Sequence, residues 1–181
     1  LAELVVKNMK EVGTPEYSNE ELEFASKIAS QFPKQEKING LRKAKVPNWE
    51  KYVDVDLVTD VLDPWGEGET SPGSSDVGDV SWVCPTLEFS TTCNILGAAG
   101  HSWAFVAAAG STIGHKSLVF AAKTMAGAAV ELLTDADLRK KVREEHGERL
   151  KDREYKTPLP EGLQPPLDIA QENWEKTPKQ Y

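Results

Sequence analysis

Two of the three histidines in this chain, His101 and His115, lie fourteen residues apart, and each directly follows a glycine. A neutral imidazole is the commonest nitrogen ligand for zinc-class metals, so the pair could bind a metal ion. Either ring could instead act as a catalytic base or pack in the interior. The spacing is no metal signature by itself, since HExxH is absent, and all three interpretations stay open. A glycine before each histidine would let the backbone approach another element closely.

Residues 71–82, SPGSSDVGDVSW, contain two carboxylates that could serve such a histidine. Asp76 and Asp79 could hold a ligating imidazole through its second ring nitrogen, or bind the metal directly. The serines, glycines and aspartates could also form an anion-binding nest of backbone N–H groups. An ordinary turn is the alternative. The segment has neither the GxSxG pattern of a nucleophile elbow nor a phosphate-loop pattern.

The third candidate chemistry is a thiol–imidazole pair formed by Cys84 or Cys93 with His101. Cys93 alternates with apolar residues, so burial as a small hydrophobic side chain is the competing expectation. Two cysteines without zinc-finger spacing indicate a reduced, cytoplasmic protein, although one disulfide stays possible. The remaining histidine, His146, falls in a charged segment and is predicted to be solvated.

Helices are predicted at the start of the chain. Residues 1–12 have apolar side chains at helical spacing, followed by Gly13 as a C-cap. Residues 18–32 begin with a capping box formed by Ser18 and Glu21, and the two helices are expected to form a hairpin. The predicted buried stripe of the second helix consists of Leu22, Ala25, Ile28, Ala29 and Phe32. Residues 34–52 are predicted to be irregular.

Strands are predicted at residues 53–62 and 87–95, where apolar residues alternate with polar ones. A long Gly-, Pro- and Ser-rich loop over residues 63–79 separates them. The segment 115–133 is apolar nearly all round and is predicted to be a buried helix, followed by a charged, solvated helix over 135–150. Residues 151–181 form a proline-rich tail that should run extended.

The composition limits the class of protein. The chain has 181 residues, 39% of them hydrophobic, and a net charge of −8. This length supports one domain with a real core. The acidic balance argues against nucleic acid and against an anionic membrane surface. No signal peptide or uninterrupted apolar run of about 20 residues is visible, so no membrane segment is expected. The first residue is Leu1 rather than Met, which suggests a piece of something longer.

Three segments together resemble a known family. They are KNMKEVGTPEYSNEELEFA (residues 7–25), SPGSSDVGDVSWVCPT (71–86) and GHSWAFVAAAGSTIGHKSLVFAAKTMA (100–126). In this order they resemble the C-terminal portion of the p-aminobenzoyl-glutamate utilization protein B group. That group is similar to the metal-dependent amidohydrolases and peptidases that include aminoacylases and carboxypeptidase G. The resemblance runs from Leu1 to about Pro166, and residues 38–52 match nothing in it.

The resemblance implies an α/β catalytic domain with an inserted lid domain, and two divalent metal ions, zinc or manganese. A metal-bridging water would attack an amide carbonyl, with a glutamate as general base. In this family a late histidine in a Gly-x-x-x-His-[Ser/Thr] setting is a metal ligand. GAAGHS, residues 97–102, is similar to that setting, so the resemblance implies His101 as the ligand, with His115 as runner-up.

The same resemblance places the segment Ser74-Ser75-Asp76 near the active site. Asp76 would be a structural carboxylate there, with Ser75 and Asp79 also close to the metals or the substrate. The chain departs from the family because it has no His-x-Asp ligand pair, no Glu-Glu dyad and no sign of the lid domain. A single imidazole cannot hold a catalytic metal, so the other ligands are expected outside this chain.

These observations combine into one set of expectations. The fold class is α/β, with helices packed on a small sheet; residues 1–150 form the C-terminal portion of a catalytic domain and residues 151–181 a tail. The intact protein would cleave small amides of N-acyl amino acids, such as p-aminobenzoyl-glutamate, in the cytoplasm. Its expected partners are the missing N-terminal half of the domain and further copies of itself, but neither nucleic acid nor a membrane. The alternative is a non-catalytic binding or regulatory module in which the histidines only pack.

Overall fold

The described part of the chain is built from helices. A computed structural model describes residues 1–69, 75–165 and 167. In chain order the elements of these residues are α1 (Ala2–Val12), α2 (Asn19–Ala29), α3 (Lys34–Lys43), the 3₁₀ helix η1 (Trp49–Tyr52), α4 (Val77–Val83), α5 (Trp103–Ala109), α6 (Thr112–Thr134) and α7 (Ala136–Leu150).

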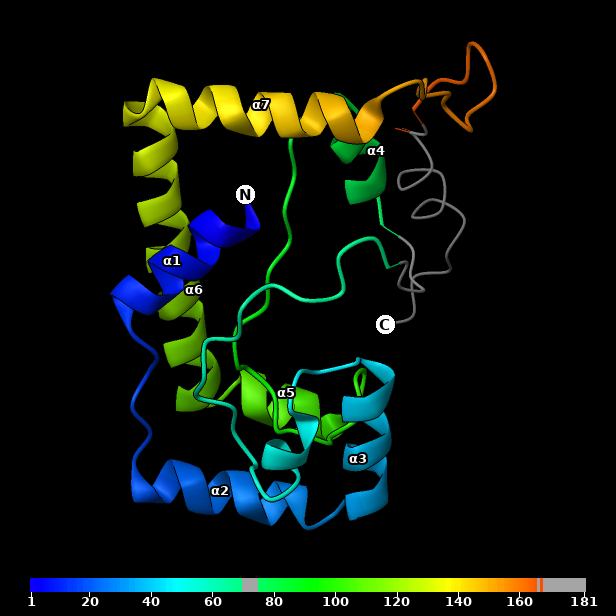
Figure 1. The fold of residues 1–181 in the computed structure, drawn as a ribbon. Coiled ribbons are helices and arrows are strands. Elements are labelled where there is room, and N and C mark those ends of the chain that lie inside the picture. Colours follow the sequence, from blue (N-terminus) through cyan, green and yellow to red (C-terminus); the bar gives the residue numbers. More distant parts are fainter. Residues whose placement is uncertain (70–74, 166, 168–181) are drawn as a thin grey trace.

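The first two helices form where the sequence predicts them. The residue after α1 is Gly13, whose φ of 77° lies in the left-handed region that glycine adopts without strain. Ser18 and Glu21 form both halves of the predicted capping box at the start of α2. The predicted hairpin is wrong, because α1 packs on α6 while α2 lies at the other end of the molecule (Figure 1).

The segment predicted to be irregular, residues 34–52, instead contains α3 and η1. Its inward positions are Lys37 and Leu41, one helical turn apart. Lys37 can be buried because its Nζ donates to the Val55 carbonyl at 2.8 Å and to Asp56 Oδ1 at 2.9 Å. A lysine at an inward position breaks the apolar periodicity, which is why the sequence pattern does not reveal this helix.

The predicted α/β fold is wrong, because the described residues contain no strand. Residues 53–62 and 87–95 run as irregular segments, although they do pass close to each other. The backbone N–H of Leu96 donates to the Asp56 carbonyl at 2.8 Å, and the Thr92 hydroxyl donates to the Val58 carbonyl at 2.6 Å. The alternation in sequence reflects burial of residues such as Leu57 and Ile95 against helices.

Two small cores lie toward opposite ends of α6. The first joins α2, α5, the start of α6 and the two irregular segments through Ala25, Ile28, Leu57, Ile95, Ala104, Ala108 and Ile113. The second is centred on Leu4, Val5 and Ala128, where α1 crosses α6 near the start of α7. Leu22, predicted to be buried, is instead 46% exposed. The single long helix α6 therefore connects both halves of the molecule (Figure 1).

Two glycines of α6 allow neighbouring helices to approach it. A Cβ atom at Gly114 would collide with the backbone of Ala109 at the end of α5. A Cβ atom at Gly127 would collide with the Asn8 side chain of α1. Asn8 in turn donates to the Leu4 carbonyl at 2.9 Å and to Glu131 Oε1 at 2.7 Å. These contacts fix where α1 and α5 pack along α6.

The prediction that residues 115–133 form a buried helix is half wrong. The helix is present, but only 22% of its most apolar 18-residue window is buried. By length and composition α6 could also cross a membrane, with a mean hydropathy of 1.3 over that window, and it is the one such helix found among the described residues. The expectation of no membrane segment therefore stays a prediction.

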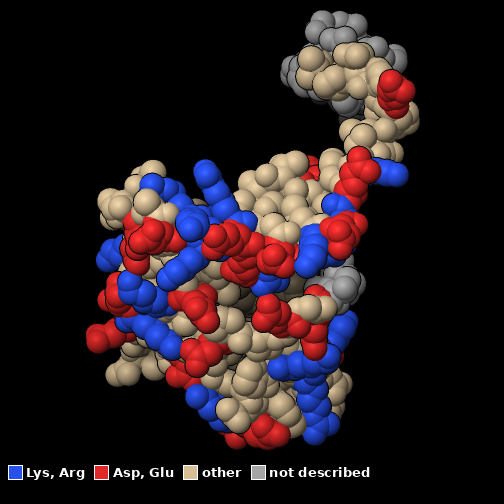
Figure 2. All heavy atoms as spheres, turned by 45° about the horizontal axis from the view of Figure 1, so that its top comes forward, with Lys and Arg blue, Asp and Glu red and all other residues tan. Residues whose placement is uncertain are grey.

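The charged helix α7 lies on the surface, as its sequence predicts. None of its residues is buried, and Asp135 caps its start by accepting from the Leu138 N–H at 2.9 Å. In Figure 2 the top of Figure 1, where α7 lies, is turned toward the viewer. Acidic and basic side chains are intermingled on this side. Arg149, for example, pairs with Glu145 at 2.8 Å and with Glu67 at 2.7 Å. Exposed pairs of this kind add little stability each. The helix also packs on α6.

Candidate functional site

The strongest candidate, His101, lies at the end of a loop anchored on α3. Gly97 begins this loop with a φ of 93°, and a Cβ atom there would lie 2.9 Å from the Cβ atom of Lys37. Lys37 is itself fixed by its ion pair with Asp56. Any larger residue at position 97 would press on this buried lysine, so glycine is required for the loop to pack.

The backbone at His101 is in an unusual conformation. Its φ of 54° lies in the left-handed region, which residues other than glycine seldom adopt. The next residue, Ser102, caps α5: its Oγ accepts from the Phe105 N–H at 3.4 Å and donates to the Ala99 carbonyl at 2.6 Å. The His101 side chain is exposed, and none of the described residues forms a hydrogen bond with its ring. Among the described residues, the loop therefore presents an imidazole without a hydrogen-bond partner before the start of α5.

His115 has a different setting, near the start of α6. Its side chain is exposed and borders a groove with Val12, Val119 and Phe120. The preceding glycine, Gly114, makes the close approach to α5 that the sequence predicts, whereas Gly100 has no neighbour within 4 Å of a Cβ. His101 and His115 thus flank opposite ends of α5. Within the described residues, no three His, Cys, Asp or Glu side chains are grouped to hold a metal ion.

The predicted carboxylates lie around α4, which is beside α7 and away from α5 (Figure 1). Asp76 precedes α4 and is exposed, and the Ser75 hydroxyl accepts from the Val77 N–H at 3.1 Å. Asp79 accepts a hydrogen bond from the Tyr155 hydroxyl at 2.6 Å. The structure does not bring these residues to His101, so their predicted place near an active site stays a prediction. Residues 70–74 of the same segment lie outside the described part.

The prediction that His146 is solvated is wrong. Its Nε2 lies 2.8 Å from the Ser81 carbonyl oxygen and ties α7 to α4. On the other side of α4, the Trp82 ring packs against Tyr155 with 6.0 Å between ring centroids. His146 therefore has a structural role in holding α4 on α7.

The thiol chemistry finds no support. Cys84 and Cys93 are both free, Cys84 being exposed and Cys93 half-buried. The Cys84 thiol donates to the Val80 carbonyl at 3.6 Å, and among the described contacts neither sulfur meets a histidine ring. Without a neighbouring base a thiol stays largely protonated and is a weak nucleophile.

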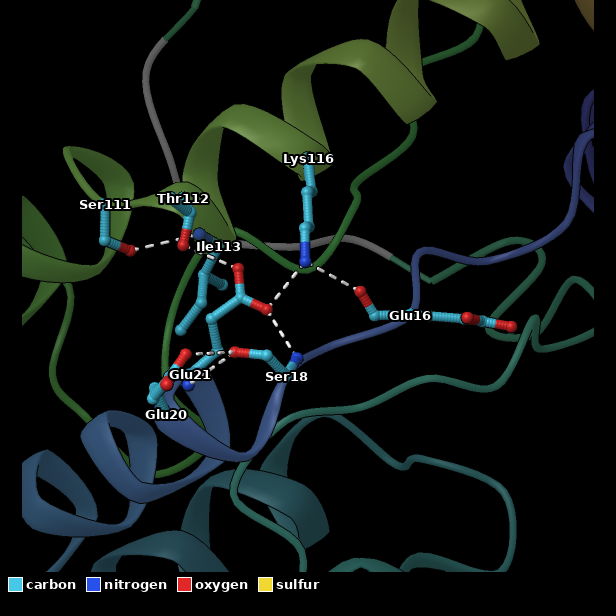
Figure 3. A network of polar contacts seen from close by, with 8 residues as sticks. All are labelled: Glu16, Ser18, Glu20, Glu21, Ser111, Thr112, Ile113 and Lys116. Carbon is cyan, nitrogen blue, oxygen red and sulfur yellow. Dashed lines mark hydrogen bonds and ion pairs between the residues drawn. The ribbon is translucent and has the colours of Figure 1, made fainter.

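A polar network at the start of α6 is not predicted as a whole by the sequence. Figure 3 shows the carboxylate of Glu21 receiving hydrogen bonds from α6 and from Ser18, the residue that caps its own helix. Lys116 Nζ donates to Glu21 Oε2 at 2.6 Å and to the Glu16 carbonyl at 2.8 Å. The Thr112 hydroxyl donates to Glu21 Oε1 at 2.5 Å, and the Ser18 N–H donates to Oε2 at 2.7 Å.

These donors stabilise the charged form of Glu21. Hydrogen bonds from Lys116, then from Thr112, lower the pKa of Glu21 to about 2. A carboxylate this acidic is a poor general base near neutral pH, so the network is structural and joins α2 to α6. Sequence spacing reveals the capping box, but it cannot reveal Lys116, which lies 95 residues away.

The chain is similar to a known protein over most of its length. It is 30% identical over 160 residues to one of the subunits of p-aminobenzoyl-glutamate hydrolase from Escherichia coli (strain K12). The match covers 84% of this chain but 33% of the relative, so the chain spans about a third of the protein it matches. No family model and no solved structure matches it. The resemblance stated from the sequence motifs is confirmed, and the relative's name describes part of a hydrolase.

Proposed function

We propose that this chain forms the C-terminal part of the catalytic domain of a metal-dependent amidohydrolase. The substrates of the whole protein would be amides of N-acyl amino acids, of the p-aminobenzoyl-glutamate type. The observation that carries the proposal is the 30% identity, over 84% of this chain, to a hydrolase named for that substrate. An origin in a hydrolase family follows from this similarity, whereas the metal dependence and the substrate are the proposal.

In this proposal His101 supplies one imidazole ligand. Its exposed ring, its left-handed backbone and its anchored loop support that role. A residue in this conformation costs on the order of 1–3 kcal/mol, and such strain is concentrated at functional sites. Lys45, Asn48 and Asp152 also have a positive φ, so the backbone of His101 supports the role only together with its exposed ring and anchored loop. The Ser102 cap and the contact between Gly97 and Lys37 hold the backbone in place.

The described residues do not by themselves fit the two zinc or manganese ions that the resemblance implies. A catalytic zinc needs about three protein ligands and an open position, and no such group exists in the described part. The remaining ligands and the general base would have to come from elsewhere in the longer polypeptide in which the proposal places this chain. No step of the reaction is assigned to this chain, which is expected to be inactive alone.

The test compares two histidines in that longer polypeptide. We expect His101→Ala to lower hydrolysis of p-aminobenzoyl-glutamate by about 100-fold or more and to lower the bound metal, since even residues that only support metal ligands cost 10–100-fold. His115→Ala is the matched control, because it removes a second exposed imidazole, which lies in the first turn of α6.

Metal content is measured beside activity so that a lost ligand can be told from a misfolded protein. Full metal and full activity in His101→Ala would refute the proposed role of His101. If His115→Ala alone lost both, the ligand would be His115. If neither variant changed activity or metal, the non-catalytic module would be the better account.

A further inference from the structure

The outward face of α6 carries large apolar side chains that are exposed. Leu118, Met125 and Leu133 are 70%, 59% and 78% exposed. Their spacing of seven and eight residues places them along one side of the helix. Val119 and Val130 extend the same stripe and are more than half exposed. Monomeric proteins seldom leave a continuous apolar surface of this length in water.

The inward face of the same helix combines the apolar Ile113 and Phe120 with polar and small residues. Ser117 and Thr124 are almost completely buried, and Ala128 lies one turn further on. The Thr124 hydroxyl has no hydrogen-bond partner in the described structure. Burying Ser and Thr while exposing Leu and Met opposes the hydrophobic effect, unless another surface covers the outer side.

We propose that the outer face of α6 is an interface, and that the remaining part of the same longer polypeptide covers it with an apolar surface. This inference rests on the proposed function. The occupant follows from chain length, because the larger part of the relative has no counterpart in this chain. The apolar character of the face fits a permanent contact within one protein, since transient interfaces are more polar.

The shape of the face indicates how closely the covering surface approaches. Ala122, Ala126 and Ala129 are exposed between the larger side chains, so the stripe is shallow. Between positions 118 and 130 the one charged residue is Lys123. A flat apolar surface of a sheet or helix could therefore pack against α6 along most of its length, with an acceptor group beside Lys123.

Thiol labelling tests which surface covers the face. The reporter is Met125→Cys in the stripe, and the control is Lys141→Cys on the exposed side of α7. Labelled positions are identified by mass spectrometry, so that Cys84 and Cys93 stay in place. In this chain alone both introduced thiols should react at similar rates. In the longer polypeptide the reporter should react about 100-fold more slowly, because it reacts only through local opening, while the control is unchanged.

Three results would overturn the inference. Equal reporter rates in the chain and in the longer polypeptide would show that the face stays open. Slow, concentration-dependent labelling of the chain alone, with a doubled mass, would show that a second copy covers it. Slowing by phosphatidylcholine vesicles would show a lipid surface instead.

A second reporter, Leu133→Cys, guards against a local effect of one substitution. Labelling needs neither metal nor activity, so its result is independent of the His101→Ala test. A protected reporter together with a fully active His101→Ala variant would keep the interface and reject the proposed metal ligand.

Discussion

The backbone of His101 and the side chain of Glu21 show two different uses of a polar residue in this protein. His101 is exposed and held in a left-handed conformation, with no described hydrogen bond to its ring. Glu21 is nearly buried, and every donor around it stabilises its charge. The imidazole of His101 is therefore accessible to a ligand, whereas the carboxylate of Glu21 holds α2 and α6 together.

Glu21 should make the stability of the protein depend on acid. Its pKa is lowered from 4.5 to about 2 in the folded state, so it contributes stability at pH values above about 4.5. That contribution should be lost as the pH falls from about 4.5 toward 2, because the unfolded state takes up a proton in this range while the folded state keeps Glu21 charged. Urea unfolding of the wild type and of Glu21→Gln, measured across this range, checks the prediction.

The two unfolding curves should differ most at neutral pH and converge near pH 2. Glu23→Gln is the matched control on the same helix, since Glu23 pairs with Lys27 in an exposed ion pair worth little. A Glu21→Gln variant with the same pH dependence as the wild type would contradict a structural role for this carboxylate.

At the scale of elements, local signals were predictable and long-range ones were not. The capping box at Ser18 and the terminal Gly13 depend on neighbours in sequence, and both are confirmed. The predicted sheet was wrong because alternation of apolar and polar residues indicates only that every second side chain is buried, as at Leu57. It does not indicate whether a strand or a helix buries that side chain. The left-handed backbone of His101 lies in a loop that packs on Lys37 of α3 through Gly97, sixty residues away in sequence, and no local pattern encodes that contact.

Helix packing around α6 gives a matched pair of glycine substitutions. Gly114→Ala should destabilise the protein by about 1–3 kcal/mol, because the new Cβ meets the backbone of α5 and helices must move apart. Gly147→Ala in α7 has no atom within 4 Å of the new Cβ and should stabilise by about 0.5–1 kcal/mol. Thermal or urea unfolding measures both.

The sign of the change in unfolding free energy of each variant distinguishes a steric clash from a gain in helix propensity. Both substitutions replace a helical glycine by alanine, so a loss of stability at position 114 alone points to the close approach of α5 and α6. A Gly114→Ala variant at least as stable as the wild type would mean that the two helices do not pack as described.

At the scale of the whole molecule, two small cores are joined by one long helix that exposes a row of large apolar side chains. Such an arrangement buries little apolar surface for 181 residues, and an isolated chain of this kind should be marginally stable and prone to associate. The similarity to about a third of a larger hydrolase component gives a reason for this design. We propose that the chain completes a larger fold and that the proposed metal site is completed in the same way.

The most direct measurement is hydrolysis of p-aminobenzoyl-glutamate by this chain co-expressed with the rest of the proposed polypeptide. We predict activity and bound metal in the combined protein, none in the 181-residue chain alone, and loss of both when the chain carries His101→Ala. Full activity in the combination carrying His101→Ala, or hydrolysis by the chain alone, would contradict the claim that His101 is one ligand of a site shared with the rest of the protein.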